Sequence, residues 1–157
     1  MTYIKHYISI LFYIAIISCN TFIFGLPPYI SIEERIKECT LIVIGDVQVL
    51  RQRNLFEETK SATLIVENVK VLKNTNHLSI PEFFYLYVKI YPETFENKLK
   101  FVPEEGKYII FLEPVIKNNE VVIYKLYKEE PFALEPWTKQ KEERIINFLK
   151  NQNDSKK

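Results

Sequence analysis

The residues best suited to catalysis are few in this 157-residue chain, which contains two cysteines, two histidines and three glycines. A serine or cysteine nucleophile needs a histidine beside it as a base, and beyond the first 26 residues His77 is the only histidine. His77 stands in a polar loop, where a solvated side chain is expected. No Gly-x-Ser-x-Gly, His-Glu-x-x-His or phosphate-loop pattern occurs. The sequence therefore predicts a non-enzyme with no catalytic residues, no metal site and no cofactor.

Adjacent glutamates are the one plentiful source of acid–base groups. Five such pairs occur, at residues 33–34, 57–58, 104–105, 129–130 and 142–143. All five are expected in loops or on helix faces, where paired carboxylates are normally solvated. A glycosidase-like dyad depends on the separation of its carboxylates in space, so these pairs do not define one.

Tyrosines on a predicted strand are the best candidates for a binding surface. Residues 83–91 read FFYLYVKIY, a strand whose aromatic side chains point to both faces of a sheet. Because a solvated sheet face is normally polar, one interpretation is that the last helix and Trp137 cover the second face. The other is that Tyr85 and Tyr87 form an exposed platform for an extracytoplasmic protein, peptide or glycan.

The overall charge gives no sign of a nucleic-acid partner. The chain has 21 basic and 20 acidic residues, a net charge of +1, which provides no excess positive field. Its 47% hydrophobic and 26% charged content is typical of a globular protein. We therefore expect a folded domain that does not bind nucleic acid.

The first 18 residues have the features of a secretory signal peptide. Lys5 is their only charged side chain, and a nearly unbroken apolar run follows from Tyr7 to Ser18. The run lacks a polar stripe at helical spacing, which argues against a buried amphipathic helix. A second alternative is an uncleaved anchor, because Tyr7 to Leu26 is long enough to span a bilayer. Removing the one lysine of residues 1–18 leaves 20 basic and 20 acidic residues, so the exported part is formally neutral.

Cys19 directly follows this run, and Ile16-Ile17-Ser18-Cys19 resembles the lipobox of bacterial lipoprotein precursors. The resemblance implies that the signal is cut before Cys19 and that Cys19 is acylated. Several acyl chains together anchor a protein stably, so the protein is expected to be exported and lipid-anchored to the bacterial cell envelope. The alternative is a secreted protein in which Cys19 is a free thiol or forms a disulfide with Cys39.

The remaining pattern predicts a tether, a short helix, five strands and a final helix. Residues 19–30 form the lipid-anchored tether, and Ser31 caps a helix that ends near Cys39. The alternation of apolar residues predicts strands at residues 40–50, 61–72, 83–91, 106–114 and 120–127. A helix over residues 138–150 precedes a flexible tail at 151–157.

Several irregularities interrupt these strands. Gly45 and a change of alternation near Asn68 indicate β-bulges, which closure of a small barrel needs. The charged residues 51–58 are expected in a hairpin or loop, and Pro114 is expected to end its strand. We therefore predict that residues 31–150 form a mainly β domain, a five-stranded antiparallel OB-like barrel with a short N-terminal and a C-terminal helix. The alternative is an α+β, cystatin-like fold with a helix packed on a sheet.

Three segments in order resemble the bacterial extracytoplasmic relatives of netrin modules and tissue inhibitors of metalloproteinases. These are IKECTLIVIGDVQVL, TLIVENVKVLKNT and FVPEEGKYIIFLEP. The resemblance covers residues 31–128 and implies the OB-like barrel. In the animal inhibitors a free N-terminal cysteine chelates the zinc of the target protease. Here the Cys-x-Cys opening is absent, acylation would block Cys19, and Cys39 is expected as a small buried residue.

The functional prediction is therefore a non-enzymatic binding or scaffolding module at the cell envelope. Its membrane contact is the lipid anchor, and its other partner is an extracytoplasmic protein or glycan. The alternative is a secreted module similar to a protease inhibitor.

The mature N-terminus distinguishes these two functions. We expect mass spectrometry of the mature protein to find residues 1–18 removed and a diacyl or triacyl group on Cys19. An unmodified Cys19 in a disulfide would favour the inhibitor-like alternative. Processing that is insensitive to globomycin would count against the lipoprotein prediction.

Overall fold

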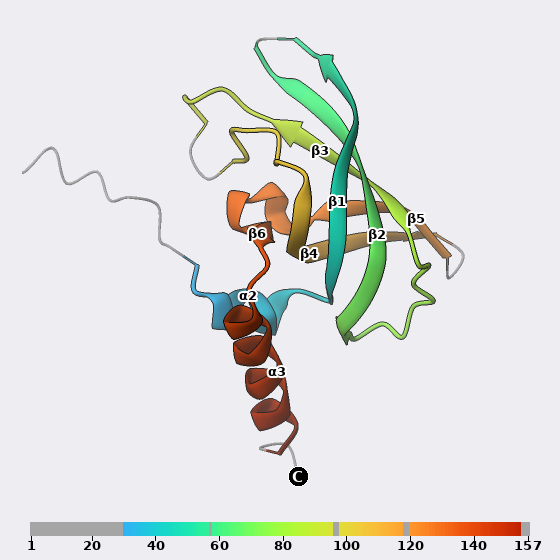
Figure 1. Cartoon of the computed structure of the whole chain (residues 1–157), viewed down its shortest axis with the longest axis vertical. Coiled ribbons are helices and arrows are strands. Elements are labelled where there is room, and N and C mark those ends of the chain that lie inside the picture. Colours follow the sequence, from blue (N-terminus) through green and yellow to red (C-terminus); the bar gives the residue numbers. More distant parts are fainter. Residues whose placement is uncertain (1–29, 57, 96–97, 118–119, 155–157) are drawn as a thin grey trace, which may run out of the picture.

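The structure is a computed structural model that describes residues 30–56, 58–95, 98–117 and 120–154 (Figure 1). The predicted signal peptide, Cys19 and the tether before residue 30 lie outside these ranges, so what was inferred for them stays a prediction. Among the described helices, none combines the length and the apolar character needed to cross a membrane.

Two helices flank the strands in the chain. The elements before the C-terminal segment are α2 (Ile32–Glu38), β1 (Leu41–Asn54), β2 (Lys60–Asn74), β3 (Phe84–Ile90), β4 (Gly106–Lys117) and β5 (Glu120–Leu126). The C-terminal segment consists of two 3₁₀ turns, η1 (Tyr127–Glu129) and η2 (Pro131–Ala133), the short strand β6 (Leu134–Pro136), and α3 (Lys139–Asp154). In Figure 1 both helices lie at one end of the strands, and the tip of the β1–β2 hairpin lies at the other.

The five long strands close into a barrel, which confirms the mainly β, OB-like prediction and excludes the cystatin-like alternative. Their order is β1–β2–β3–β5–β4, and β4 pairs back onto β1. All neighbours are antiparallel except β3 and β5, which run parallel where Leu86 faces Tyr124. Strands that alternate in direction around a closed ring must be even in number. Five strands therefore force one parallel pair, and the prediction of an entirely antiparallel barrel is wrong at this contact.

Alternate side chains of β2 and β3 fill the barrel interior, together with the inward-facing side chains of β1 and β4. On β3 every second residue is buried and the residues between are exposed. In β1 and β4, by contrast, Leu41–Ile44 and Tyr108–Leu112 are buried without interruption. Both faces of these two strands are therefore covered. Ile36 of α2 and Ile145 of α3 join the same apolar cluster, and β6 extends the sheet at the edge of β4 and adds Leu134 to that cluster.

Two predicted irregularities in β1 and β2 form a single bulge. The register skips between Ile44 and Asp46, where β2 contributes one residue more than β1. Asn68 adopts a left-handed backbone with φ of 52°, and its Nδ2 donates to Asp46 Oδ2 at 2.8 Å. A Cβ at Gly45 would lie 2.5 Å from Val66 Cγ1 and 3.1 Å from the Glu67 carbonyl oxygen. Glycine is therefore the residue that lets β1 approach β2 this closely.

β1, β2 and β4 are longer than the sequence predicted. Residues 51–54 belong to β1 and pair with residues 60–63 of β2, so the region predicted as a hairpin or loop is a hairpin whose loop is shorter than 51–58. The charge of residues 51–54 reflects exposure of an arm of β1 that extends beyond β4, because β4 pairs with β1 only as far as Val47. Pro114 does not end β4, which continues to Lys117. From Pro114 onward the register pairs β4 with β5 alone, and proline is tolerated on a strand edge that lacks a partner.

The C-terminal segment also differs from its prediction. Residues 151–154 continue α3 as a helix, which is therefore longer at its C-terminal end than the predicted 138–150. A polar helix end that projects into solvent needs no apolar face. Thr138 caps the helix, since its Oγ1 accepts from the Lys141 backbone N–H at 3.2 Å. β6 was not predicted, because a three-residue strand carries too little alternation to be recognised.

A buried arginine joins α2 to the C-terminal segment. Ser31 caps α2 as predicted, accepting from the Glu34 N–H at 3.2 Å, and Arg35 then points into the protein with no exposed surface. Its Nη1 lies 2.6 Å from Glu135 Oε1 and also donates to the Phe132 carbonyl oxygen. The guanidinium lies over the rings of Phe111 and Phe132, at 5.2 and 5.5 Å from their centroids. Arg35 thus links the first helix to β4, η2 and β6.

Replacing Gly45 by alanine should destabilise the barrel by about 1–3 kcal/mol, because the added methyl group overlaps Val66 unless β1 and β2 move apart. The measurement is urea unfolding of the Gly45→Ala variant against wild type. Gln52→Ala, on the exposed arm of the same strand, is the control and should change the free energy of unfolding by less than about 0.5 kcal/mol. Equal stability of Gly45→Ala and wild type would contradict the close approach.

Removing the buried guanidinium should cost about 3–5 kcal/mol in the Arg35→Ala variant, because Glu135 loses its main partner and a cavity remains. Arg35→Met keeps most of the volume and should lose less. Arg144→Ala is the matched control, since Arg144 pairs with Glu33 on the surface with 59% of its side chain exposed, and should cost at most about 1 kcal/mol. Chemical unfolding compares the three, and a loss at Arg35 no larger than at Arg144 would refute the role of this ion pair.

Candidate binding surface

The two predicted tyrosines lie on the outer face of β3. Tyr85 is 56% exposed and Tyr87 is 45% exposed, because their neighbours in the alternation fill the barrel interior. The interpretation that Trp137 and the last helix cover them is wrong. The Trp137 backbone N–H donates to the Lys107 carbonyl oxygen at 2.8 Å, and its indole donates to Glu142 at 2.8 Å, so this ring is held beside β4. We call Tyr85 and Tyr87 the tyrosine ridge.

Strand pairing places basic and hydroxyl side chains in rows beside the tyrosine ridge. Tyr87 is opposite Thr63 on β2, and Thr63 is opposite Arg51 on β1. In the next row Lys89, Ser61 and Arg53 follow one another in the same way. Residues that are opposite in a sheet project from the same face, so Arg51 and Tyr87 lie two strand spacings apart, about 10 Å.

A second bulge in β1 brings the two arginines to this face. The register skips between Val49 and Arg51, so Leu50 has no partner on β2. Val49 is opposite the interior residue Leu64, and in a regular strand, with Leu50 paired, the alternation would place Arg51 on the interior side. Because Leu50 forms a bulge instead, Arg51 and Arg53 project outward with the tyrosine ridge.

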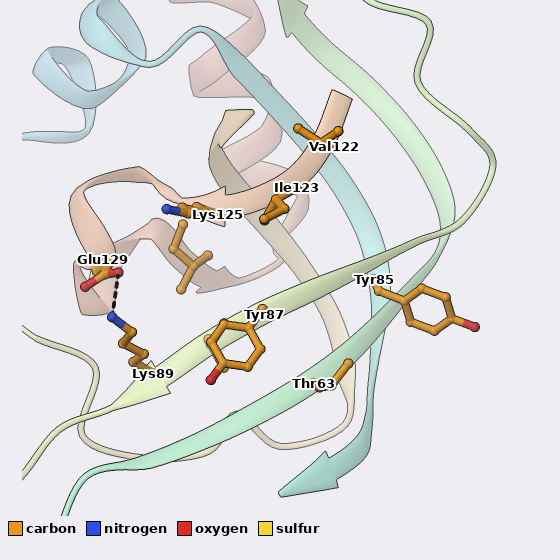
Figure 2. Close-up of a pocket in the computed structure, with 10 residues that line it drawn as sticks. Thr63, Tyr85, Tyr87, Lys89, Val122, Ile123, Lys125 and Glu129 are labelled. Atoms are coloured by element: carbon orange, nitrogen blue, oxygen red, sulfur yellow. Dashed lines mark ion pairs between the residues drawn. The ribbon is translucent and has the colours of Figure 1, made fainter. Parts of the chain in front are cut away.

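A groove runs along each side of the tyrosine ridge, and both tyrosines line both grooves. The first groove has a volume of about 520 Å³ and lies between β3 and β5. Figure 2 shows its walls, with Tyr87 and Lys89 projecting from β3 and Val122, Ile123 and Lys125 from β5. The core residues Val88 and Leu126 also line this groove, which therefore reaches down to the barrel interior.

The second groove, also about 520 Å³, lies between the ridge and β1. Its lining combines apolar, basic and hydroxyl side chains: Leu50, Arg51, Arg53, Leu55, Ser61 and Thr63. The mixture offers hydrogen-bond donors beside exposed apolar surface, as sites for polar ligands commonly do. The tyrosine ridge and the two grooves together form a continuous face over β1, β2, β3 and β5.

Glu129 ends the first groove. It belongs to η1, where Lys128 and Glu129 adopt left-handed backbones with φ of 49° and 53°, a conformation that non-glycine residues rarely adopt. Its carboxylate accepts from the Tyr91 hydroxyl at 2.6 Å and lies 4.0 Å from Lys89 and 3.8 Å from Lys98. Burial and this hydrogen bond raise the pKa of Tyr91 to about 12. These contacts fix the carboxylate at the rim of the groove (Figure 2).

The other candidate residues lie apart from this face. Cys39 is a buried free thiol whose Sγ donates to the carbonyl oxygens of Leu41 and Leu112 at 3.1 and 3.3 Å. Burial raises the pKa of this thiol to about 11. His77 is exposed in the turn after β2. Within the described ranges, no three His, Cys, Asp or Glu side chains gather as a metal site would require.

Comparison with known proteins does not assign this chain to a family. No protein-family model matches the sequence, and a search of curated proteins finds no match.

Sequence reasoning identified the tyrosines but missed the basic residues beside them. Arg51 and Arg53 lie in residues 51–58, which are predicted as a hairpin or loop, and Lys125 lies in the predicted strand 120–127; neither pattern indicates a basic surface. One pattern could have identified the arginines as strand residues. The alternation of inward and outward side chains in β1 resumes after Leu50 if Leu50 is treated as a bulge. β3 and β5 line the same groove because they are neighbours in the closed barrel. No pattern within either strand's sequence indicates that they are neighbours.

The buried thiol of Cys39 should resist alkylation in the native protein. With a pKa of about 11, roughly 0.1% of the thiol is ionised at about pH 8, against roughly a quarter for an ordinary cysteine. We expect the native Cys19→Ser variant, whose only cysteine is Cys39, to react with iodoacetamide at least about a hundredfold more slowly than the same chain in denaturant. The rate should rise about tenfold per pH unit below pH 11. Rapid labelling at neutral pH would contradict the burial.

Proposed function

We propose that this chain is a non-enzymatic binding module of the cell envelope, and that the tyrosine ridge with its two grooves is the ligand-binding face. The observation that carries the proposal is the pair of tyrosine rings exposed between two grooves on one sheet face. Exposed aromatic side chains on the β2–β3 face are the means by which OB-like barrels hold extended ligands.

The shape of this face favours a chain-like ligand over a small molecule. Both tyrosines line both grooves, and the tyrosine ridge stands between them. A ligand that lies across the ridge would contact both rings and both groove walls. Small molecules are instead bound in concave sites that enclose most of their surface.

The proposal includes an anchor upstream of the barrel. Cys19, acylated and inserted in the membrane, would be joined to residue 30 by the ten residues 20–29, and these eleven residue-to-residue steps extend to about 40 Å at most. The helix end of the barrel is nearest this tether, and the β1–β2 hairpin points to the opposite end (Figure 1). An anchored barrel would therefore present its hairpin and the arginine-lined groove away from the membrane.

Binding by the tyrosine ridge is tested with four soluble polymers: oligogalacturonate, its methyl-esterified form, oligo-thymidylate and poly-glutamate. We expect the full-length chain to bind at least one of them. The Tyr85→Ala and Tyr87→Ala variants should each weaken that binding by roughly tenfold or more, because stacking on an aromatic side chain contributes about 1–3 kcal/mol. Isothermal titration calorimetry measures both affinities.

Phe101→Ala is the matched control, because Phe101 is 71% exposed and lines neither groove. It should bind as wild type does. Thermal unfolding of all three variants excludes a general loss of structure. The proposal is overturned if wild type binds none of the four polymers, or if both tyrosine variants bind as tightly as Phe101→Ala.

A further inference from the structure

The charge of the proposed binding face differs from that of the whole chain. The whole chain carries a net charge of +1. The residues that line the two grooves include four basic side chains and one acidic side chain: Arg51, Arg53, Lys89, Lys125 and Glu129. A nearly neutral sequence therefore folds into a protein with a locally basic face.

Three of these cations are available to a ligand. Lys89 faces Glu129, although at 4.0 Å this pair is loose. Within the part of the chain that the structure describes, no carboxylate forms an ion pair with Arg51, Arg53 or Lys125. All three are exposed. Unpaired arginines at the edge of an apolar groove are suited to bidentate contact with carboxylates.

We propose that the ligand of the tyrosine ridge is an acidic polysaccharide, a chain of sugar rings that carries carboxylates. This inference rests on the proposed function and specifies its ligand. The flat C–H faces of sugar rings would stack on Tyr85 and Tyr87. Carboxylates on the same chain would reach Arg51 and Arg53 on one side of the ridge and Lys125 on the other.

Glu129 distinguishes a sugar chain from a polyphosphate backbone. Its carboxylate is held at the end of the first groove by Tyr91, Lys89 and Lys98. A carboxylate accepts hydrogen bonds from the free hydroxyls of a sugar chain, whereas the phosphodiester backbone of oligo-thymidylate offers it no hydroxyl within the chain. The single acidic residue in a basic face thus favours a ligand that carries hydroxyls as well as negative charges.

The hydroxyl-bearing rows support the same ligand. Thr63 lies between Arg51 and Tyr87, and Ser61 lies between Arg53 and Lys89 but is only 3% exposed. The half-buried Thr63 hydroxyl can donate and accept a hydrogen bond, as can the hydroxyls of a sugar. An acidic peptide would supply carboxylates to the arginines, but it offers few hydroxyls to Thr63 and Glu129.

The decisive comparison uses oligogalacturonate and its methyl-esterified form, which share the sugar chain and differ in charge. We expect the full-length protein to bind the acid form at least about tenfold more tightly than the ester. Raising the ionic strength from about 0.01 M to about 0.15 M should weaken binding of the acid form and leave the ester unaffected. Tyr87→Ala should weaken both forms.

The basic residues are tested with two charge-matched double variants. Arg51→Gln/Arg53→Gln should weaken binding of the acid form by roughly tenfold for each arginine and should bind the ester as wild type does. Lys139→Gln/Lys150→Gln removes two positive charges from the exposed surface of α3 and should leave both affinities unchanged. Unfolding midpoints of the two variants confirm that each is folded.

Each outcome decides one of the two proposals. Equal affinity for the acid form and the ester refutes the proposal that the ligand is acidic. If Tyr87→Ala weakens binding of the acid form and of the ester in that case, the proposed binding function still holds. Binding of oligo-thymidylate or poly-glutamate in place of the sugar chain also refutes the ligand class alone. If the tyrosine variants bind every polymer as wild type does, the proposed function fails, and the inference about its ligand fails with it.

Discussion

The fold depends on the close approach of β1 and β2 at Gly45. β1 must pair with β2 along one edge and with β4 along the other, which bends it where the ring closes. The bend occurs at the bulge in which Gly45 lies against Val66, and the extra residue of β2 is accommodated by the left-handed backbone of Asn68. A Cβ at position 45 would overlap Val66 and crowd the Glu67 carbonyl oxygen, so Val66 or the strands would have to shift. The close approach of β1 and β2, and with it the best packing of the closed barrel, therefore depends on the absence of one methyl group.

The first groove arises from the same closure. An odd number of strands leaves β3 and β5 parallel, and among the described residues their ladder has a single pair, Leu86 with Tyr124. In the part of the chain that the structure describes, no further pair joins the two strands, and the buried residues Val88 and Leu126 form the floor of the groove. A fully paired, even-numbered barrel would seal this region with backbone hydrogen bonds. The groove is thus a consequence of topology, and side chains determine only its walls and charge.

Local patterns were sufficient for most of the fold. The alternation of β3, the cap at Ser31 and the bulges at Gly45 and Asn68 were all predictable, because each depends on neighbours in the chain. Contacts between distant segments were not. The arginines of β1 were predicted to lie in a hairpin or loop because β1 continues beyond its pairing with β4. Residues 51–54 are all exposed there, so they show no alternation of apolar and polar side chains. Trp137 was predicted to cover one face of the strand at residues 83–91. It lies beside β4 instead, where its backbone N–H donates to the Lys107 carbonyl oxygen, and no local sequence pattern indicates this contact. The lipid anchor at Cys19 lies outside the described residues and stays a prediction.

The ion pair between Arg35 and Glu135 joins residues that are 100 positions apart. During synthesis α2 emerges before the strands, and Arg35 then has no carboxylate of β6 to receive it. The buried ion pair can form only after all five barrel strands and β6 have been made. The first described helix therefore acquires its charged partner from the segment that follows the last barrel strand.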